Sequence, residues 1–267
     1  MSYFPETPRL LMRASVFALS LAFLFAPRIA SAEPTEITVR VLAKDSKFVG
    51  TSMGGMRIVL RDAHTREILA AGVTQGGTGS TKLIMHEDRG RRAHLSDESA
   101  AKFTTMIHLD APRLIEAEAY GPLGQPQAAV RVLSTQWVVP GRGITGGDGW
   151  VLDLPGLVVD VLSPPAHVRL PANTTVVDLR ANVVMMCGCP IEPKGLWNAD
   201  RLEIKAIVNR NGERVAQVDL AYAGETSQFA TKLPIEAPGD YEVIVYAHDP
   251  SNGNTGIDRT TFIATER

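Results

Sequence analysis

The sequence predicts an all-β protein with two tandem β-sandwich domains, which follow a segment removed on export. Three observations support this prediction. Apolar and polar residues alternate with a period of two in many short runs, turns rich in glycine and proline separate these runs, and only one short segment has a helical period. A chain of 267 residues is also long enough for two such domains.

The first 32 residues have the three parts of a secretory signal peptide. Arg9 and Arg13 form a basic region, residues 14–26 form an apolar run, and residues 30–32 (Ala-Ser-Ala) fit the small-residue cleavage pattern. The apolar run is too short to cross a hydrocarbon layer of about 30 Å. We therefore expect cleavage after Ala32, and a periplasmic or extracellular protein that does not span a membrane.

The charge of the remaining chain excludes one class of partner. Beyond residue 32 the acidic side chains outnumber the basic ones by four. A protein that binds nucleic acid needs a basic face to neutralise phosphates. We therefore expect no nucleic-acid partner. The charge indicates no specific partner and leaves a protein partner in the cell envelope open.

The first domain is expected over residues 33–155. Alternating runs predict strands at 37–42, 56–61 and 68–73, and the polar turn between the last two makes them a hairpin. Residues 96–103 are predicted to form a short helix with Ser96 as N-cap. The other strands are expected at 82–85, 104–109, 114–120, 128–133 and 150–154.

The domain boundary is expected near Gly156. Residues 140–150 contain five glycines, which is typical of a flexible connection or a long irregular loop. Pro164 and Pro165 interrupt the chain soon afterwards. We therefore expect a second domain at 156–267, with a core separate from that of the first.

The second domain is also predicted to consist of strands. The pair Asn211-Gly212 is a strong hairpin signal between two alternating runs. The strands are expected at 157–162, 174–186, 201–209, 213–221, 228–233, 241–248 and 257–264.

Two segments resemble known sandwich families. Residues 238–241 (Pro-Gly-Asp-Tyr) resemble the tyrosine corner that opens strand F of an immunoglobulin-like sandwich. This resemblance implies that 174–186 is strand B, and that Val243 replaces the core cysteine of antibody domains. Residues 55–60, with the turn at 74–77, resemble a transthyretin-like or carboxypeptidase-regulatory-like sandwich. Both resemblances imply architecture and not chemistry.

The two cysteines are the strongest functional signal. Cys187 and Cys189 follow two methionines, so five residues carry four sulfur atoms. Soft sulfur ligands favour Cu(I) or a redox site. In an extended strand Met185, Cys187 and Cys189 share one face. The immunoglobulin-like strand order places the B–C and F–G loops at one end, so we expect His248 to complete a copper site.

Other interpretations of these residues stay open. Gly188 permits a bend that would allow a disulfide between the two cysteines, and the sulfur-bearing side chains could equally fill the core. The loop after His248 carries the oxygen ligands that calcium prefers, although the spacing does not match an EF-hand. Those four residues are Asp249, Asn252, Asn254 and Asp258.

The sequence therefore predicts an exported, non-enzymatic binding protein that holds a soft metal, copper, through Cys187, Cys189, Met185 and His248. No nucleophile motif of a hydrolase occurs in it. One alternative is a structural or interaction module of the cell envelope. Another is a Cys-x-Cys thiol–disulfide redox protein.

Overall fold

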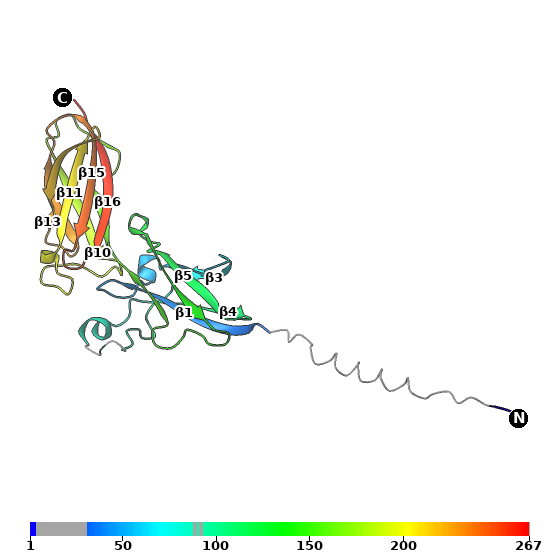
Figure 1. The fold of residues 1–267 in the computed structure, drawn as a ribbon. Coiled ribbons are helices and arrows are strands. Elements are labelled where there is room, and N and C mark those ends of the chain that lie inside the picture. The colour runs from blue at the N-terminus through cyan, green and yellow to red at the C-terminus, as the bar shows by residue number, and fades with distance from the viewer. Residues whose placement is uncertain (4–30, 88–89, 91–92, 267) are drawn as a thin grey trace.

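The computed structural model describes residues 1–3, 31–87, 90 and 93–266 (Figure 1). Almost all of the predicted signal peptide lies outside these ranges, so cleavage after Ala32 stays a prediction. Among the residues that are described, no helix is long and apolar enough to cross a membrane. The chain is all-β, as predicted, and its strands form four sheets.

Two sheets come from the part of the chain before Gly156. In the first, the central strand β1 pairs with β4 in antiparallel orientation and with β7 in parallel orientation. In the second, the strand order is β3-β2-β5-β6, with antiparallel pairing throughout. Their bounds are β1 (Glu33–Ala43), β2 (Arg57–Asp62), β3 (Ile68–Val73), β4 (Phe103–Leu109), β5 (Arg113–Gly121), β6 (Val130–Val138) and β7 (Trp150–Leu154).

The structure differs from two of the predictions for this part. The expected helix at 96–103 is absent, because the Asp148 carboxylate accepts both the backbone N–H and the hydroxyl of Ser96. Ser96 therefore caps no helix, and Phe103 begins β4. Residues 82–85 were expected to form a strand, but a π-helical turn occupies Lys82–His86. The other helical turns, which the sequence did not reveal, are Thr51–Met53, Pro126–Ala128 and Ala199–Arg201.

The glycine-rich segment 140–150 is an ordered irregular loop. Its residue Ile144 donates to the carbonyl of Glu36 at 2.9 Å and accepts from the N–H of Thr38 at 3.0 Å. Both partners lie on β1, so the segment runs along that strand. Of the two predicted interpretations, the irregular loop is correct and the flexible connection is wrong.

The part after Gly156 has the strand order of an immunoglobulin-like sandwich. One sheet has the order β13-β14-β10-β8, and the other β12-β11-β15-β16-β9. These correspond to strands D-E-B-A and to C′-C-F-G, with β9 added in parallel beside β16. The bounds are β8 (Leu157–Ser163), β9 (Val168–Leu170), β10 (Val176–Met185), β11 (Glu203–Arg210), β12 (Glu213–Asp219), β13 (Ala221–Tyr222), β14 (Gln228–Pro234), β15 (Gly239–His248) and β16 (Thr255–Ala264).

The predicted tyrosine corner is present at the start of β15. The Tyr241 hydroxyl donates to the Ala237 carbonyl at 2.8 Å, and its ring stacks on Phe262 with centroids 5.0 Å apart. Val243, in the place of the antibody cysteine, is fully buried. The hydrogen bond ties the chain entering β15 to the loop before it. The resemblance to an immunoglobulin-like fold is therefore confirmed by strand order and by this contact.

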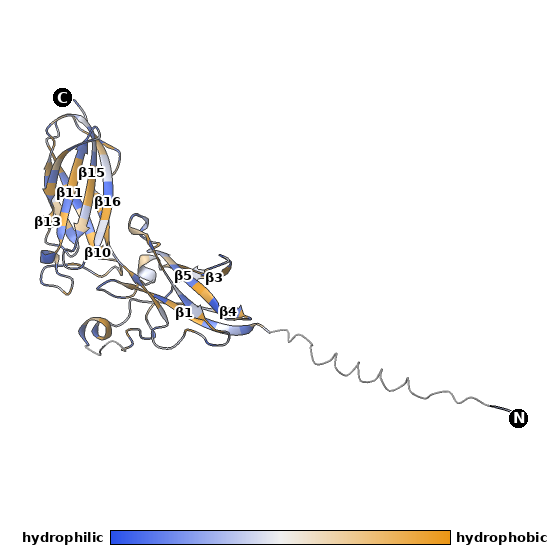
Figure 2. Ribbon diagram, in the orientation of Figure 1, coloured by the Kyte–Doolittle hydropathy of each residue, from blue (hydrophilic) through white to orange (hydrophobic). Residues whose placement is uncertain are grey.

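The two parts meet through apolar packing. Each sheet uses strands from one side of Gly156 only. Orange and blue residues alternate along the strands in Figure 2, as expected for strands with one buried face. The buried apolar side chains nevertheless form one connected cluster. The buried side chains of the two parts are therefore in contact, and the division into two domains near Gly156, each with its own core, stays a prediction.

Replacing Tyr241 by Phe removes the hydroxyl of the corner and leaves the part-buried Ala237 carbonyl without this donor. We expect the free energy of unfolding to fall by about 1 to 2 kcal/mol. Chemical denaturation followed by tryptophan fluorescence measures this loss.

The matched control is Tyr222→Phe. In the described part of the chain the Tyr222 ring packs edge-on against Phe229, and its hydroxyl makes no hydrogen bond. We expect its removal to change stability by less than about 0.5 kcal/mol. Equal losses for the two variants would contradict the assigned corner.

Candidate functional site

The cysteine motif forms a tight turn at the end of β10. The Gly188 N–H donates to the Met185 carbonyl at 2.7 Å, and the Met185 N–H donates to the Cys189 carbonyl at 3.1 Å. Gly188 has φ +77°, the left-handed conformation that closes a three-residue hairpin loop. The chain is therefore not extended at Cys187 and Cys189, so the shared strand face considered for Met185, Cys187 and Cys189 is absent. Met186 is as deeply buried as its neighbours.

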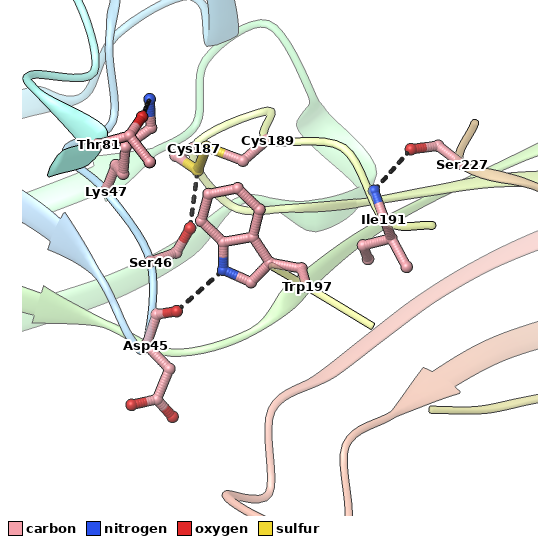
Figure 3. Close-up of a disulfide and its surroundings, with 9 residues drawn as sticks. All are labelled: Asp45, Ser46, Lys47, Thr81, Cys187, Cys189, Ile191, Trp197 and Ser227. Carbon is pink, nitrogen blue, oxygen red and sulfur yellow. Dashed lines mark hydrogen bonds between the residues drawn. A yellow bond between two sulfur atoms is a disulfide. The ribbon is translucent and has the colours of Figure 1, made fainter. Parts of the chain in front are cut away.

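A disulfide joins Cys187 and Cys189 (Figure 3). The turn brings their Cα atoms to 5.4 Å, well within bridging range, whereas an extended strand would hold them about 6.5 Å apart. Only 1% of Cys187 and 5% of Cys189 are exposed. Of the three interpretations drawn from the sequence, the structure contains the disulfide. In this form neither sulfur is a thiolate that could bind a soft metal.

The turn contacts the bend that follows β1. The hydroxyl of buried Ser46 donates to the Cys187 sulfur at 2.9 Å. Beside it, the Trp197 indole N–H donates to the Asp45 carbonyl at 3.0 Å, and Figure 3 shows both bonds close together. Ser46 and Cys187 are 141 residues apart in sequence. The turn therefore connects the two parts of the chain.

The same bend also holds the loop between β15 and β16. The Lys44 ammonium donates to the Asn252 carbonyl at 2.7 Å, and the Asn252 amide donates to the Asp45 carboxylate at 2.8 Å. The Asn254 amide donates to the Lys44 carbonyl at 3.2 Å. One short bend from the first part thus binds the B–C and F–G loops of the second part together.

Apolar contacts lie beneath these hydrogen bonds. A Cβ atom on Gly188 would lie 2.6 Å from the Met53 sulfur, so that methionine packs directly on the turn. A Cβ atom on Gly156 would lie 3.5 Å from the Met186 methyl group. Met53 therefore packs on the disulfide-bearing turn, and Met186, which precedes Cys187 in the chain, packs beside Gly156.

His248 lies at the end of β15, opposite Glu203 on β11. Its Nδ1 is 3.1 Å from the Thr255 hydroxyl. Nowhere in the described ranges do three or more His, Cys, Asp or Glu side chains form a group that could hold a metal ion. The structure therefore gives no support to a copper site with His248 or to a calcium site in the F–G loop, and both stay predictions.

A cavity of about 340 Å³ opens where the three loops meet. Met85, Met185 and Trp197 supply apolar wall, and Leu196 at its margin is 45% exposed. Asp45, Arg201 and Asp249 add charged groups. Since this one cavity is lined by both the B–C and the F–G loops, the prediction that they lie at the same end is confirmed.

Sequence reasoning did not find the bend at Asp45 and Ser46. These residues follow an alternating strand and have the composition of an ordinary turn. No local signal indicates that a turn packs against a loop so far along the chain. Trp197 was a weak indication of a binding surface, because tryptophan is enriched among residues that bind partners.

No family model matches the chain, and no curated protein matches it. One similar solved structure is an engineered protein with 20% identity and a TM-score of 0.31, covering 48% of this chain and 24% of that one. A second is that of the fibronectin(III)-like modules of CbhA from Clostridium thermocellum, with 10% identity and a TM-score of 0.29, covering 87% of this chain and 94% of that one. A third is that of the titin domains Z1Z2 in complex with telethonin, with 11% identity and a TM-score of 0.25, covering 88% of this chain and 98% of that one. The chain thus spans about a quarter of the engineered protein's length. The assignment of the immunoglobulin-like fold rests on strand order and not on these likenesses.

Replacing Gly188 by Ala tests how tightly the turn is packed. The new methyl group would be strained at a positive φ and would overlap the Met53 sulfur. We expect a loss of about 2 to 4 kcal/mol in the free energy of unfolding, measured by chemical denaturation.

Gly212→Ala is the matched control, because Gly212 has φ +83° and nothing lies within 4 Å of its added Cβ. It should lose only about 1 kcal/mol. In a Met53→Ala background the cost of Gly188→Ala should fall to a similar value. Full additivity of the two substitutions would contradict the contact.

Proposed function

We propose that this chain is an exported, non-enzymatic interaction module that binds a protein partner at the cavity between its two parts. The observation that carries the proposal is the convergence of three loops around that cavity. The B–C and F–G loops come from the immunoglobulin-like part, and the bend at Asp45 comes from the other part. Loops held by a rigid scaffold are where binding residues concentrate in proteins.

The chemistry of the cavity suits one large apolar side chain of a partner. Its methionine and tryptophan walls offer flexible and aromatic apolar contact. Arg201, Asp45 and Asp249 offer charged groups to the polar atoms around such an anchor. A buried apolar anchor within a polar rim is the usual arrangement of an interaction hot spot.

The proposed site is tested by cross-linking in the native compartment. A photo-reactive amino acid at position 196 should capture one protein. For the test variant the photo-reactive group is moved to position 198 and Leu196 is replaced by Asp. This variant should capture the partner at least about tenfold less, because the new aspartate places a charge at the apolar margin.

The matched control is Val176→Asp. Val176 is similarly exposed, but it begins β10, whereas the cavity lies at the other end of that strand. We expect this variant to keep the captured protein at its native yield. Capture that survives Leu196→Asp, or the absence of any captured protein, would contradict the proposed site.

Copper binding is a second candidate function, and it applies to the reduced form. The methionine sulfurs of Met53, Met185 and Met186 lie at or beside the turn, and two free thiolates would add the ligands that Cu(I) prefers. Met53 was not among the ligands expected from the sequence, and it comes from the first part of the chain. The depth at which both cysteines are buried disfavours the third candidate, a thiol–disulfide exchange protein, since exchange needs an accessible sulfur.

Cu(I) titration against a chromophoric chelator tests this second function. After reduction the chain should bind one Cu(I), and Cys187→Ser should abolish binding. Met53→Ala should weaken binding by at least about tenfold if the methionine is a ligand. His248→Ala should weaken Cu(I) binding only if His248 is a ligand, as the sequence led us to expect. It should leave binding unchanged if the ligands are the two cysteines and the methionines. A reduced chain that leaves the chelator fully loaded would exclude copper binding.

A further inference from the structure

The strand β6 forms an edge of its sheet, and its surface is separate from the cavity. Its nine residues pair with β5 along their full length without a bulge. In the part of the chain that the structure describes, the strand order of the four sheets leaves no strand paired on its other side. An unpaired edge offers backbone N–H and C=O groups to another strand.

The other edge strands of the described sheets are shorter. None has more than seven residues, and two of them, β9 and β13, have three and two. Natural edges are usually protected by short length, proline, lysine or bulges. Within β6 there is no proline or lysine, and Arg131 is its single charged residue. This edge therefore lacks the features that prevent pairing.

The outward side chains of β6 are unusually apolar for a surface. Trp137 is 63% exposed and Leu133 is 54% exposed, and both lie on the same face as Arg131 and Thr135. On the opposite face the Trp150 indole donates to the Ser134 hydroxyl at 2.7 Å. The neighbouring sheet thus supports the strand from inside. On the outer face Arg131 lies 3.5 Å from the Glu118 carboxylate, and the His64 ring lies 6.5 Å from that of Trp137.

We propose that β6 pairs in antiparallel orientation with β6 of a second copy of this chain, about a two-fold axis through Ser134. This register uses all nine residues. It places Arg131 of each copy opposite Trp137 of the other copy. It likewise places Leu133 of each copy opposite Thr135 of the other, so each pair occurs twice, once on either side of the axis. An arginine over a tryptophan ring is a favourable cation–π pair, and no like charges face each other. An isologous contact of this kind closes a dimer.

The test is the oligomeric state of the full chain, measured by sedimentation velocity over a wide range of concentration. The native chain should form a dimer. The double variant Leu133→Lys with Thr135→Lys places two lysine pairs opposite each other across the axis, so we expect its dissociation constant to rise by at least about tenfold.

A charge-reversal variant then tests the register itself. Leu133→Lys with Thr135→Glu should restore the dimer, because each lysine now faces a glutamate of the other copy. Val215→Lys, on the edge strand β12 of the other part, should leave the dimer unchanged. Circular dichroism and thermal melting show that each variant remains folded.

Two results would overturn the proposal. A native chain that stays monomeric at every concentration would show that this edge does not pair with a second copy. A dimer that survives the two lysines would place the contact elsewhere on the molecule.

Discussion

The contact between Ser46 and the disulfide-bearing turn is the interaction on which the rest of the junction depends. The turn reverses the chain directly after β10, and β11 of the other sheet begins at Glu203. Gly188 supplies the left-handed residue, and the disulfide holds the reversal closed. A loop this short removes little entropy from the unfolded chain, so the bridge acts on local shape more than on global stability.

The junction has consequences for the surface around it. With the turn fixed, Asp45 in the bend accepts two hydrogen bonds. Its backbone carbonyl accepts one from the Trp197 indole, and its carboxylate accepts one from the Asn252 amide. The two loops therefore cannot move independently of the first part, and the cavity between them has walls of defined chemistry. Met53, from the first part of the chain, packs directly against the turn.

The alternation of apolar and polar residues was enough to predict most of the strands, since one face of each is buried and the other is solvated. The tyrosine corner was also predictable, because its residues are adjacent in sequence and the hydroxyl reaches a carbonyl only four residues away. The segment around Ser96 was predicted wrongly because it depends on a distant partner. Ser96 has the composition of a helix cap, but Asp148 competes for its N–H and hydroxyl.

The candidate site was only half predictable for the same reason. Sequence patterns indicated that the B–C and F–G loops meet, because strand order alone fixes that. They could not indicate that the bend at Asp45 and Ser46 packs between these loops, since its partners lie more than 140 residues away. The extended geometry assumed for the cysteines also hid the turn, which depends on the hydrogen bond between Gly188 and Met185.

The claim that this turn fixes the two parts of the chain relative to each other is tested most directly by residual dipolar couplings of the backbone amides. Couplings from strands before Gly156 and from strands after it should fit one alignment tensor, because hydrogen bonds and buried sulfur contacts join both parts. Two tensors of different magnitude would show that the parts reorient independently, and the junction described above would not hold in solution.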